Sequence, residues 1–398
     1  MISVQEATSI VMNHLGDFST ETISLQDCTG RILAEDVFAD APFPSFDRVM
    51  MDGIAINYAS WEKGNRSFPI QEMQPAGVPK TSLKNTDHCI EVMTGAILPG
   101  RTDVVIPYEE FDSKDGVITI NLETTTQWKN IHRLGTDQQT GDLLLAKNTS
   151  LSPAEIATLA AVGKSEVLVR KLPKVAIIST GDELVEVHET PAAHQIRKSN
   201  SHALAASLTE MNISTRLIHL PDEREAIISQ LKTIVAEHDV VILSGGVSKG
   251  KKDYIPEALE IIGVEKLFHR VKQRPGKPFW FGTKGKTTIF ALPGNPVATF
   301  LCFYRYVKPW ILASLTENQP QPRQSVVLTE DYTFQVPLTY FLQVKLNNEK
   351  GRLIATPIAG KGSGDFTNLN QADGFVELPD DQSQFEKGEV FRYISFRK

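Results

Sequence analysis

Three short segments of the sequence combine glycine with hydroxyl, amide or carboxyl side chains directly after an apolar run. They are IISTGDEL (177–184), ILSGGVSKGKKD (242–253) and ALPGNPVA (291–298). Short apolar, β-branched runs are typical of buried parallel strands. Glycine at a strand end lets backbone N–H groups approach an anion closely, which favours binding of a phosphate or another oxyanion. For each segment taken alone, a tight turn between a strand and a helix is the alternative.

The donors in these segments are hydroxyl groups and glycine N–H groups. The hydroxyls belong to Ser179, Thr180, Ser244 and Ser248, and the glycines are Gly181, Gly245, Gly246 and Gly294. In an open α/β sheet, ligands bind beyond the carboxyl ends of the strands, so we expect all three segments at one site. Asn295 and Pro296 also suit the N-cap and first position of a helix, and helix capping alone is the alternative for them.

Acidic side chains accompany the donors. Asp182, Glu183 and Asp253 would place negative charge beside a phosphate, which is unfavourable unless a cation lies between them. Mg²⁺ bridging carboxylate and phosphate oxygens removes that conflict. The alternative for Asp182 and Glu183 is the first turn of a helix. Asp222, in PDERE, is interpreted as the N-cap of a capping box with Glu225.

A stiff turn supplies positive charge. Lys277, with Arg274 close by, lies in RPGKPFWFG, where proline and glycine restrict the backbone. Cations at such a turn suit a phosphate or another oxyanion. A solvated loop lysine is the alternative.

The order of sequence patterns predicts a multidomain α/β protein. Proline-punctuated, β-prone runs predict a β-rich inserted domain at 41–139, flanked by an N-terminal helical or linking domain made of 1–40 and 140–170. Apolar runs alternate with helical patterns over 171–317, which predicts a doubly wound domain with parallel strands. Residues 318–398 lose the helical period and predict a small β barrel. The helices expected in the doubly wound domain lie at about 200–211, 223–237, 253–262 and 297–307.

Composition excludes several classes of function. The 398 residues carry a formal charge of −7 and have no long basic run, which argues against nucleic-acid binding. The N-terminus lacks a secretory pattern and no apolar run is long enough to span a bilayer, so we expect a cytoplasmic protein without a membrane partner. Cys28, Cys89 and Cys302 lie too far apart in sequence for a zinc or disulfide framework.

The motifs, taken in order, resemble those of the MoeA-type molybdopterin molybdenumtransferases, the group that includes the E domain of gephyrin. STGDEL, SGGVSKGKKD, PGKP and LPGNPVA resemble a molybdopterin-binding domain. Proteins of the competence-damage family share part of that fold, but the N-terminal motifs separate the two. These motifs are FPSFDRVMMDGIAI (43–56), VMTGAILPGRTDVVIPYEE (92–110) and HRLGTDQQTGDLLLAKNTSLSPAEIATLAAVG (132–163).

The resemblance implies the last step of molybdenum cofactor synthesis. Its substrates would be adenylylated molybdopterin and molybdate, and Mg²⁺-dependent hydrolysis of the adenylate would release AMP. Carried over by position, Asp182, Glu183 and Asp253 would do metal and catalytic work, with Glu183 and Asp253 as metal ligands and Lys277 holding the oxyanion. The residues that would surround the pterin or phosphate are Ser179, Thr180, Gly181, Ser244, Gly245, Gly246, Ser248, Pro293, Gly294 and Asn295.

The resemblance also implies a homodimer with a site shared between subunits. Asp52, in MDG, would act in catalysis and Thr94, in MTG, in ligand binding, both from the partner's β-rich domain. A turn aspartate before Gly53 is the alternative for Asp52. A molybdopterin adenylyltransferase and apo-molybdoenzymes are the implied partner proteins.

Departures from the family pattern and other functions stay open. Val49, Met50 and Ile54 replace the usual residues of the first motif, Lys251 stands where an acid is common, and Arg274 replaces a lysine. Leu338 and Gln343 stand where the family often has arginines. A competence-damage-type nucleotide or pyrophosphate hydrolase and a non-catalytic molybdopterin-binding scaffold are the alternative functions. Molybdate and tungstate are not distinguished by any residue.

Overall fold

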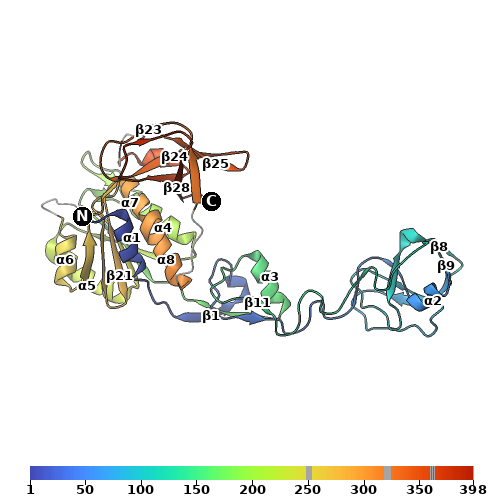
Figure 1. Cartoon of the computed structure of the whole chain (residues 1–398). Coiled ribbons are helices and arrows are strands. Elements are labelled where there is room, and N and C mark those ends of the chain that lie inside the picture. Colours follow the sequence, from blue (N-terminus) through green and yellow to red (C-terminus); the bar gives the residue numbers. More distant parts are fainter. Residues whose placement is uncertain (248–252, 318–323, 359, 361, 363, 398) are drawn as a thin grey trace. The chain divides into compact units, whose positions relative to one another are not determined.

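A computed structural model describes residues 1–247, 253–317, 324–358, 360, 362 and 364–397 (Figure 1). The chain forms two compact units. The larger comprises Met1–Ala34, Asn148–Ser152 and Glu166–Lys398, and the smaller comprises Glu35–Lys147 and Pro153–Ser165. The predicted ligand residue Ser248 and the departure at Lys251 lie outside the described residues.

A six-stranded sheet forms the centre of the larger unit. In sheet order its strands are β16 (Thr215–Leu220), β13 (Val175–Thr180), β17 (Val240–Ser244), β21 (Thr287–Leu292), β20 (Trp280–Lys284) and β18 (Glu265–His269). The first four are parallel, as predicted, whereas β20 is antiparallel to β21 and β18 to β20. These two strands were not predicted, because the proline-rich turn before Trp280 interrupts their apolar pattern.

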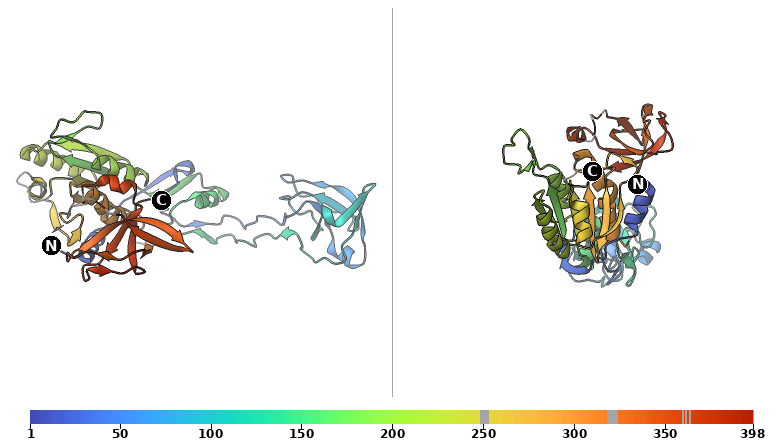
Figure 2. Two further views of the ribbon diagram at one scale, coloured as in Figure 1. Left: turned by 90° about the horizontal axis from the view of Figure 1, so that it is seen from above. Right: turned by 90° about the vertical axis from the view of Figure 1, so that its left-hand side faces the viewer.

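Helices cover both faces of this sheet because successive strand side chains point to opposite sides. Val175, Ile177 and Val240 face one helical layer, while Ala176 and Ile178 face the other. The first layer contains α1 (Val4–Met12), α4 (Asn200–Thr209), α7 (Pro296–Cys302), the π-helical turn η3 (Phe303–Val307) and α8 (Lys308–Leu315), and the second contains α5 (Arg224–Glu237) and α6 (Ile255–Ile261). Figure 2 shows the strands between the two layers, which confirms the predicted doubly wound domain.

A small β barrel at the C-terminus confirms the prediction for the last domain. Its strands, in order, are β19 (Gln273–Arg274), β24 (Thr339–Glu349), β25 (Arg352–Pro357), β22 (Gln324–Leu328), β28 (Val390–Ser395) and β26 (Gly374–Leu378). Because β26 also pairs with β24, the sheet closes on itself. The short strands β23 (Tyr332–Thr333) and β27 (Gln384–Phe385) and the 3₁₀ turn η4 (Phe366–Asn370) complete it.

Two connections fix the barrel to the central domain. Strand β19 belongs to the loop before β20, yet Gln273 and Arg274 pair in parallel with Thr339 and Tyr340 of β24. Arg305 of η3 donates from Nε to Glu377 Oε2 at 3.0 Å and from a terminal nitrogen to Oε1 at 3.3 Å. Both side chains are largely buried, and a two-pronged pair of this kind sets orientation as well as distance.

Short elements complete the larger unit. Near its N-terminus, β1 (Thr20–Ser24) pairs antiparallel with β12 (Glu166–Arg170), and the 3₁₀ turn η1 (Leu25–Asp27) follows β1. Beyond β13, β14 (Leu184–Val185) pairs in parallel with β15 (Ile196–Arg197).

The smaller unit is β-rich, as predicted. Its six-stranded sheet has the order β7 (Val104–Pro107), β4 (Gly53–Ile56), β6 (Cys89–Val92), β5 (Ser67–Gln74), β9 (Val117–Ile120) and β8 (Phe111–Lys114). Two apolar clusters pack on its strands. The remaining elements are β2 (Val37–Phe38) with β11 (Leu143–Leu145), β3 (Arg48–Val49) with β10 (Ile131–His132), α2 (Tyr58–Glu62), the 3₁₀ turn η2 (Tyr108–Glu110) and α3 (Pro153–Ala161).

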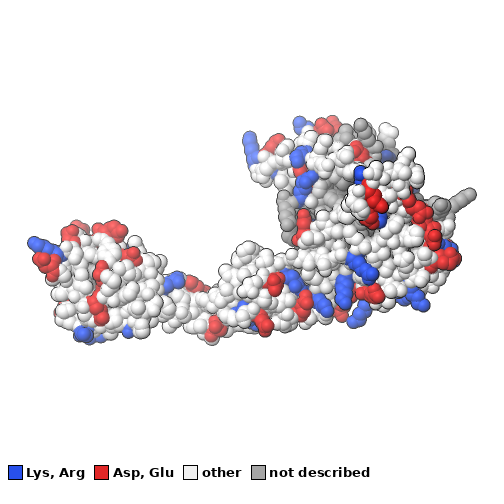
Figure 3. Space-filling model, turned by 180° about the vertical axis from the view of Figure 1, so that it is seen from behind, with Lys and Arg blue, Asp and Glu red and all other residues white. Residues whose placement is uncertain are grey.

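The charged surface is mixed. On the face shown in Figure 3, Lys and Arg side chains are interspersed with Asp and Glu. Within the described part of the chain, the helices are too short or too polar to cross a bilayer.

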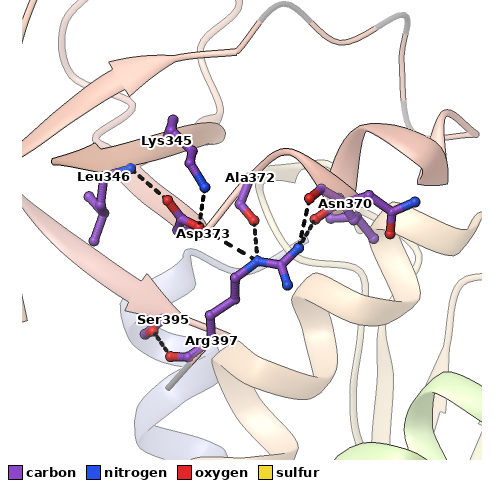
Figure 4. A network of polar contacts seen from close by, with 8 residues as sticks. Lys345, Leu346, Asn370, Ala372, Asp373, Ser395 and Arg397 are labelled. Atoms are coloured by element: carbon purple, nitrogen blue, oxygen red, sulfur yellow. Dashed lines mark hydrogen bonds and ion pairs between the residues drawn. The ribbon is translucent and has the colours of Figure 1, made fainter.

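A polar network connects the C-terminal residues of the chain to the barrel (Figure 4). Asp373 accepts hydrogen bonds of 2.8 Å from Lys345 Nζ and from the Leu346 N–H. Arg397 lies 3.6 Å from Asp373 and donates to the backbone oxygens of Ala372, Leu369 and Asn370. Burial raises the pKa of Asp373, but the Lys345 and Leu346 hydrogen bonds and the two cations outweigh it and lower the pKa.

Replacing Asp373 by Asn should destabilise the protein by about 2 kcal/mol at pH 7, because a charge-assisted pair is lost. The folded-state pKa of Asp373 is lowered from its ordinary value of 3.8, so its stabilisation is present above that unfolded-state pKa and is lost as pH falls through the folded value. Urea midpoints should therefore differ at pH 7 and converge at low pH. Asp381→Asn, at an exposed acid of the same barrel, is the control. A gap that stays constant with pH would contradict the assignment.

Candidate active site

The three predicted segments meet at one edge of the central sheet. In the register of the parallel strands, Ser179 of β13 lies beside Ser244 of β17, and Ser244 lies beside Leu292 of β21. The following loops stay in contact, since Gly245 N–H donates to Leu292 O at 3.2 Å. Adjacent parallel strands place their carboxyl ends together, so this edge is the expected ligand site of a doubly wound fold.

A cleft of about 1100 Å³ opens at this edge between the central domain and the barrel. Most of the predicted site residues line it. They are Ser179, Thr180, Gly181, Glu183, Ser244, Gly245, Gly246, Asp253, Lys277, Pro293, Gly294 and Asn295. Asp182 lies beside the cleft, where its Oδ1 accepts a hydrogen bond from the backbone N–H of Asp222.

The turn after β13 holds a carboxylate against a glycine. Gly181 has φ +128°, and a Cβ there would lie 2.6 Å from each carboxylate oxygen of Glu183. Only glycine therefore allows the Glu183 carboxylate to fold back over the strand end. Asp182 and Glu183 lead into β14 rather than into a helix, so the alternative role in a first helical turn is wrong.

The loop after β17 is equally tight. Gly246 has φ +68°, and a Cβ there would lie 2.8 Å from Ile255 Cγ1 and 3.0 Å from Thr180 Oγ1. The backbone of this loop is thereby pressed against both β13 and the start of α6.

Asp222 was misassigned from the sequence. The N-cap of α5 is Glu223, and its side chain makes no capping hydrogen bond, so the predicted capping box does not form. Asp222 instead lines the cleft after β16. Asp222, Glu183 and Asp253 thus bring acids to the cleft from the ends of three neighbouring strands.

Positively charged side chains reach the cleft from the side of β21 that faces β20. The turn that carries Arg274 and Lys277 precedes β20, and both residues line the cleft. The turn is held from beneath by Gln273, which is fully buried: its Nε2 donates to the backbone oxygens of Pro275 and Gly276. Gln273 Oε1 accepts from the Tyr306 hydroxyl at 2.5 Å, and burial raises the pKa of that hydroxyl.

Aromatic rings of the barrel support Arg274. The Arg274 guanidinium carbon lies 5.8 Å from the centre of the Phe334 ring. Phe334 stacks on Tyr340 with ring centres 4.2 Å apart, and Tyr340 also stacks on Tyr332. A cation resting on an aromatic face is stabilised there. The arginine that replaces the usual lysine at this position therefore has an aromatic ring to rest on.

Several cleft residues escaped the sequence analysis. Arg197, Lys198 and Asn200 come from the IRKSN segment that ends β15 and begins α4, and Tyr340 comes from the barrel. IRKSN does not follow a long apolar strand, which was the pattern that located the other three segments. The remaining signal in the sequence was a mixture of basic, hydroxyl and amide side chains just before a helix. Leu338 and Gln343, noted as departures from the family pattern, also line the cleft.

Asp52 and Thr94 form a preorganised pair in the smaller unit. Thr94 donates to Asp52 Oδ1 from its backbone N–H at 2.6 Å and from Oγ1 at 2.7 Å. These hydrogen bonds lower the pKa of Asp52, which is exposed. The nearby Met50, Met51 and Tyr108 side chains are also exposed.

The acid set of the cleft suits Mg²⁺ shared with a substrate. Across the described residues, no three His, Cys, Asp or Glu side chains are close enough to enclose a metal on their own. Mg²⁺ commonly takes one or two carboxylates and completes its shell with phosphate oxygens and water. The dispersed carboxylates of Glu183, Asp222 and Asp253 fit that mode, and they do not fit a closed protein cage.

The fold and the cleft define a multidomain protein with a molybdopterin-binding type of α/β domain. Matches to known families follow the same order along the chain. Residues 2–163 match the family described as MoeA N-terminal region (domain I and II), 176–313 match the "Probable molybdopterin binding domain", and 325–396 match the MoeA C-terminal region (domain IV).

Full-length relatives name the family. The chain is 40% identical over 401 residues to a molybdopterin molybdenumtransferase of Synechocystis sp., with 100% of both chains covered. It is 31% identical over 406 residues to that of Bacillus subtilis, covering 100% of this chain and 94% of the relative. A crystal structure of a molybdopterin biosynthesis MoeA protein from Pyrococcus horikoshii superposes with a TM-score of 0.82 at 29% identity, covering both chains fully. The chain belongs to the MoeA family.

Replacing Tyr306 by Phe should loosen the turn that carries Arg274 and Lys277. Removal of the hydroxyl leaves Gln273 Oε1 buried without its donor, which costs about 1–3 kcal/mol. Hydrogen exchange at the Gly276 and Lys277 amides should accelerate. Tyr304→Phe is the matched control, because the Tyr304 hydroxyl contacts Ser207 instead. Equal exchange in the two variants would mean that the Tyr306–Gln273 contact does not support the turn.

Proposed function

We propose that this protein inserts molybdenum into molybdopterin at the end of molybdenum cofactor biosynthesis, acting in the cytoplasm. It binds adenylylated molybdopterin and molybdate, hydrolyses the adenylate and releases AMP. One observation carries the proposal. In a chain of the MoeA family, three glycine-containing strand ends, three acids and four cations line a single cleft.

The reaction needs two kinds of anion site. Hydrolysis of the phosphoanhydride adds water to phosphorus and breaks the P–O bond between the two phosphates, so AMP and the molybdopterin phosphate separate. Negative charge develops on the phosphate oxygens, where the backbone N–H group of Gly246 and the Ser244 hydroxyl are the proposed donors. Molybdate, a tetrahedral oxyanion, suits Lys277 and Arg274, which offer positive charge on a rigid turn.

Glu183 and Asp253 are the proposed ligands for Mg²⁺, and Asp222 lines the same cleft. When bound, Mg²⁺ would neutralise phosphate oxygens during hydrolysis. The role of Gly181 in this scheme is steric, because the absence of a Cβ leaves room for the Glu183 carboxylate at the strand end. Asp182 acts from beside the cleft by fixing the Asp222 backbone.

Purified protein should release AMP from adenylylated molybdopterin only when Mg²⁺ and molybdate are both present. Asp253→Asn keeps the shape but removes the charge, and we expect at least a hundredfold lower rate, about 3 kcal/mol. Asp381→Asn, at an exposed barrel acid, is the control for loss of one charge. Tungstate in place of molybdate tests the choice of oxyanion. Absence of AMP release from the wild-type protein would reject the proposal.

We further propose that the active form is a homodimer in which Asp52 and Thr94 of one subunit complete the cleft of the other. Thr94 holds the Asp52 carboxylate in one orientation, and the exposed Met50 and Met51 directly precede Asp52 in the sequence, as expected of a contact surface. The substrate would come from a molybdopterin adenylyltransferase and the product would go to apo-molybdoenzymes.

Subunit mixing tests the shared site. Asp52→Ala and Asp253→Ala chains should each be inactive alone. After co-refolding in equal amounts, half of the dimers contain one chain of each kind. Each such dimer has one intact site and one site that lacks both residues, so activity should return to about a quarter of wild type. If both residues act within one chain, mixed dimers contain no intact site and activity stays absent.

A further inference from the structure

Asn200, the first residue of α4, connects the two glycine-rich loops. Its side-chain nitrogen lies 2.9 Å from Ser244 Oγ at the end of β17 and 2.8 Å from Gly294 O in the loop after β21. A third contact of 3.3 Å reaches Thr299 Oγ1 of α7. Thr299 in turn donates toward the backbone oxygens of Pro293 and Asn295. One amide therefore joins a helix to both loops.

The orientation of this amide follows from chemistry. Gly294 O is a carbonyl oxygen and only accepts, so the NH₂ end of Asn200, not its oxygen, must face it. The same NH₂ group donates its other hydrogen to Ser244 Oγ. Asn200 thereby donates a hydrogen bond to one acceptor on each loop, Ser244 Oγ and Gly294 O.

The contact with Asn200 restricts the direction in which the Ser244 hydroxyl can donate its hydrogen. Ser244 Oγ accepts from Asn200, so its own hydrogen must point elsewhere. Among the residues that the structure describes, the Ser244 hydroxyl contacts no acceptor side chain or carbonyl, and Ser244 lines the cleft. Its hydrogen is available to a ligand oxygen, and an ionised phosphate offers acceptors only.

We propose that Asn200 is a positioning residue that gives the cleft floor its hydrogen-bond polarity. It engages the Gly294 carbonyl, which would repel an anion, and turns the Ser244 hydroxyl into a donor toward a phosphate group. The proposal rests on the proposed function for the identity of the phosphate ester, and it names a residue that contacts the site loops rather than the reacting atoms.

The informative substitution is Asn200→Asp. Aspartate has the same shape and is favourable in the first turn of a helix, so α4 itself is not weakened. However, a carboxylate only accepts: it repels Gly294 O and draws the Ser244 hydrogen away from the cleft. Binding of AMP, measured by calorimetric titration, should weaken at least tenfold, as expected for loss of a hydrogen bond to a charged group.

A double-mutant cycle separates polarity from general damage. Ser244→Ala alone should also weaken AMP binding about tenfold. The double variant Asn200→Asp with Ser244→Ala should bind AMP no more weakly than either single variant, because both substitutions remove the same donor. Asn200→Ala, which leaves Ser244 free to rotate, should lose less than Asn200→Asp. Asn347→Asp, at an exposed position of β24, controls for the added charge.

The outcomes are distinguishable from those for the proposed function. Additive losses in the cycle, or equal losses in Asn200→Ala and Asn200→Asp, would overturn the positioning role, as would a wild-type protein that does not bind AMP. If wild type binds AMP but releases none from adenylylated molybdopterin, the proposed function fails while the cycle still decides the role of Asn200. Melting temperatures of all variants show whether α4 stays folded.

Discussion

The parallel register of β13, β17 and β21 is the constraint on which the site depends. Inside these strands the apolar side chains are buried on both faces of the sheet and serve packing, so only residues at the strand ends can reach a ligand. Chemistry is confined to the positions where each strand ends. Since neighbouring parallel strands end together, residues that lie far apart in sequence share one cleft. The glycines in these loops let the strand ends pack closely against one another.

Much of the fold followed from local patterns. Buried parallel strands are continuous apolar runs, and the apolar residues that open the three glycine-containing segments lie at the ends of β13, β17 and β21, as predicted. Strands β18 and β20 were missed because the proline-rich turn that separates them interrupts their apolar pattern. The two-residue strand β19 was also unpredictable, since it has no pattern of its own and exists only because β24 lies beside it.

For the site, sequence reasoning located loops better than individual contacts. Glu183, Ser244 and Lys277 line the cleft because motifs at strand ends must meet. Asp222 was misjudged because a capping box needs only a spacing, whereas the actual helix start depends on tertiary packing. Asn200 was missed for a different reason. Its importance comes from contacts to residues that lie far along the chain, and no local pattern records them.

The β19 pairing has a consequence for how this protein can be altered. One strand of the barrel is encoded within the central domain, and the same turn carries Arg274 and Lys277, two of the cations that line the cleft. The barrel is therefore not an interchangeable module, although its fold closes on itself. A barrel grafted from a relative would need a β24 that accepts this particular strand, and a poor fit would disturb the cations as well as the graft. Barrel and cleft are thus expected to change together during evolution.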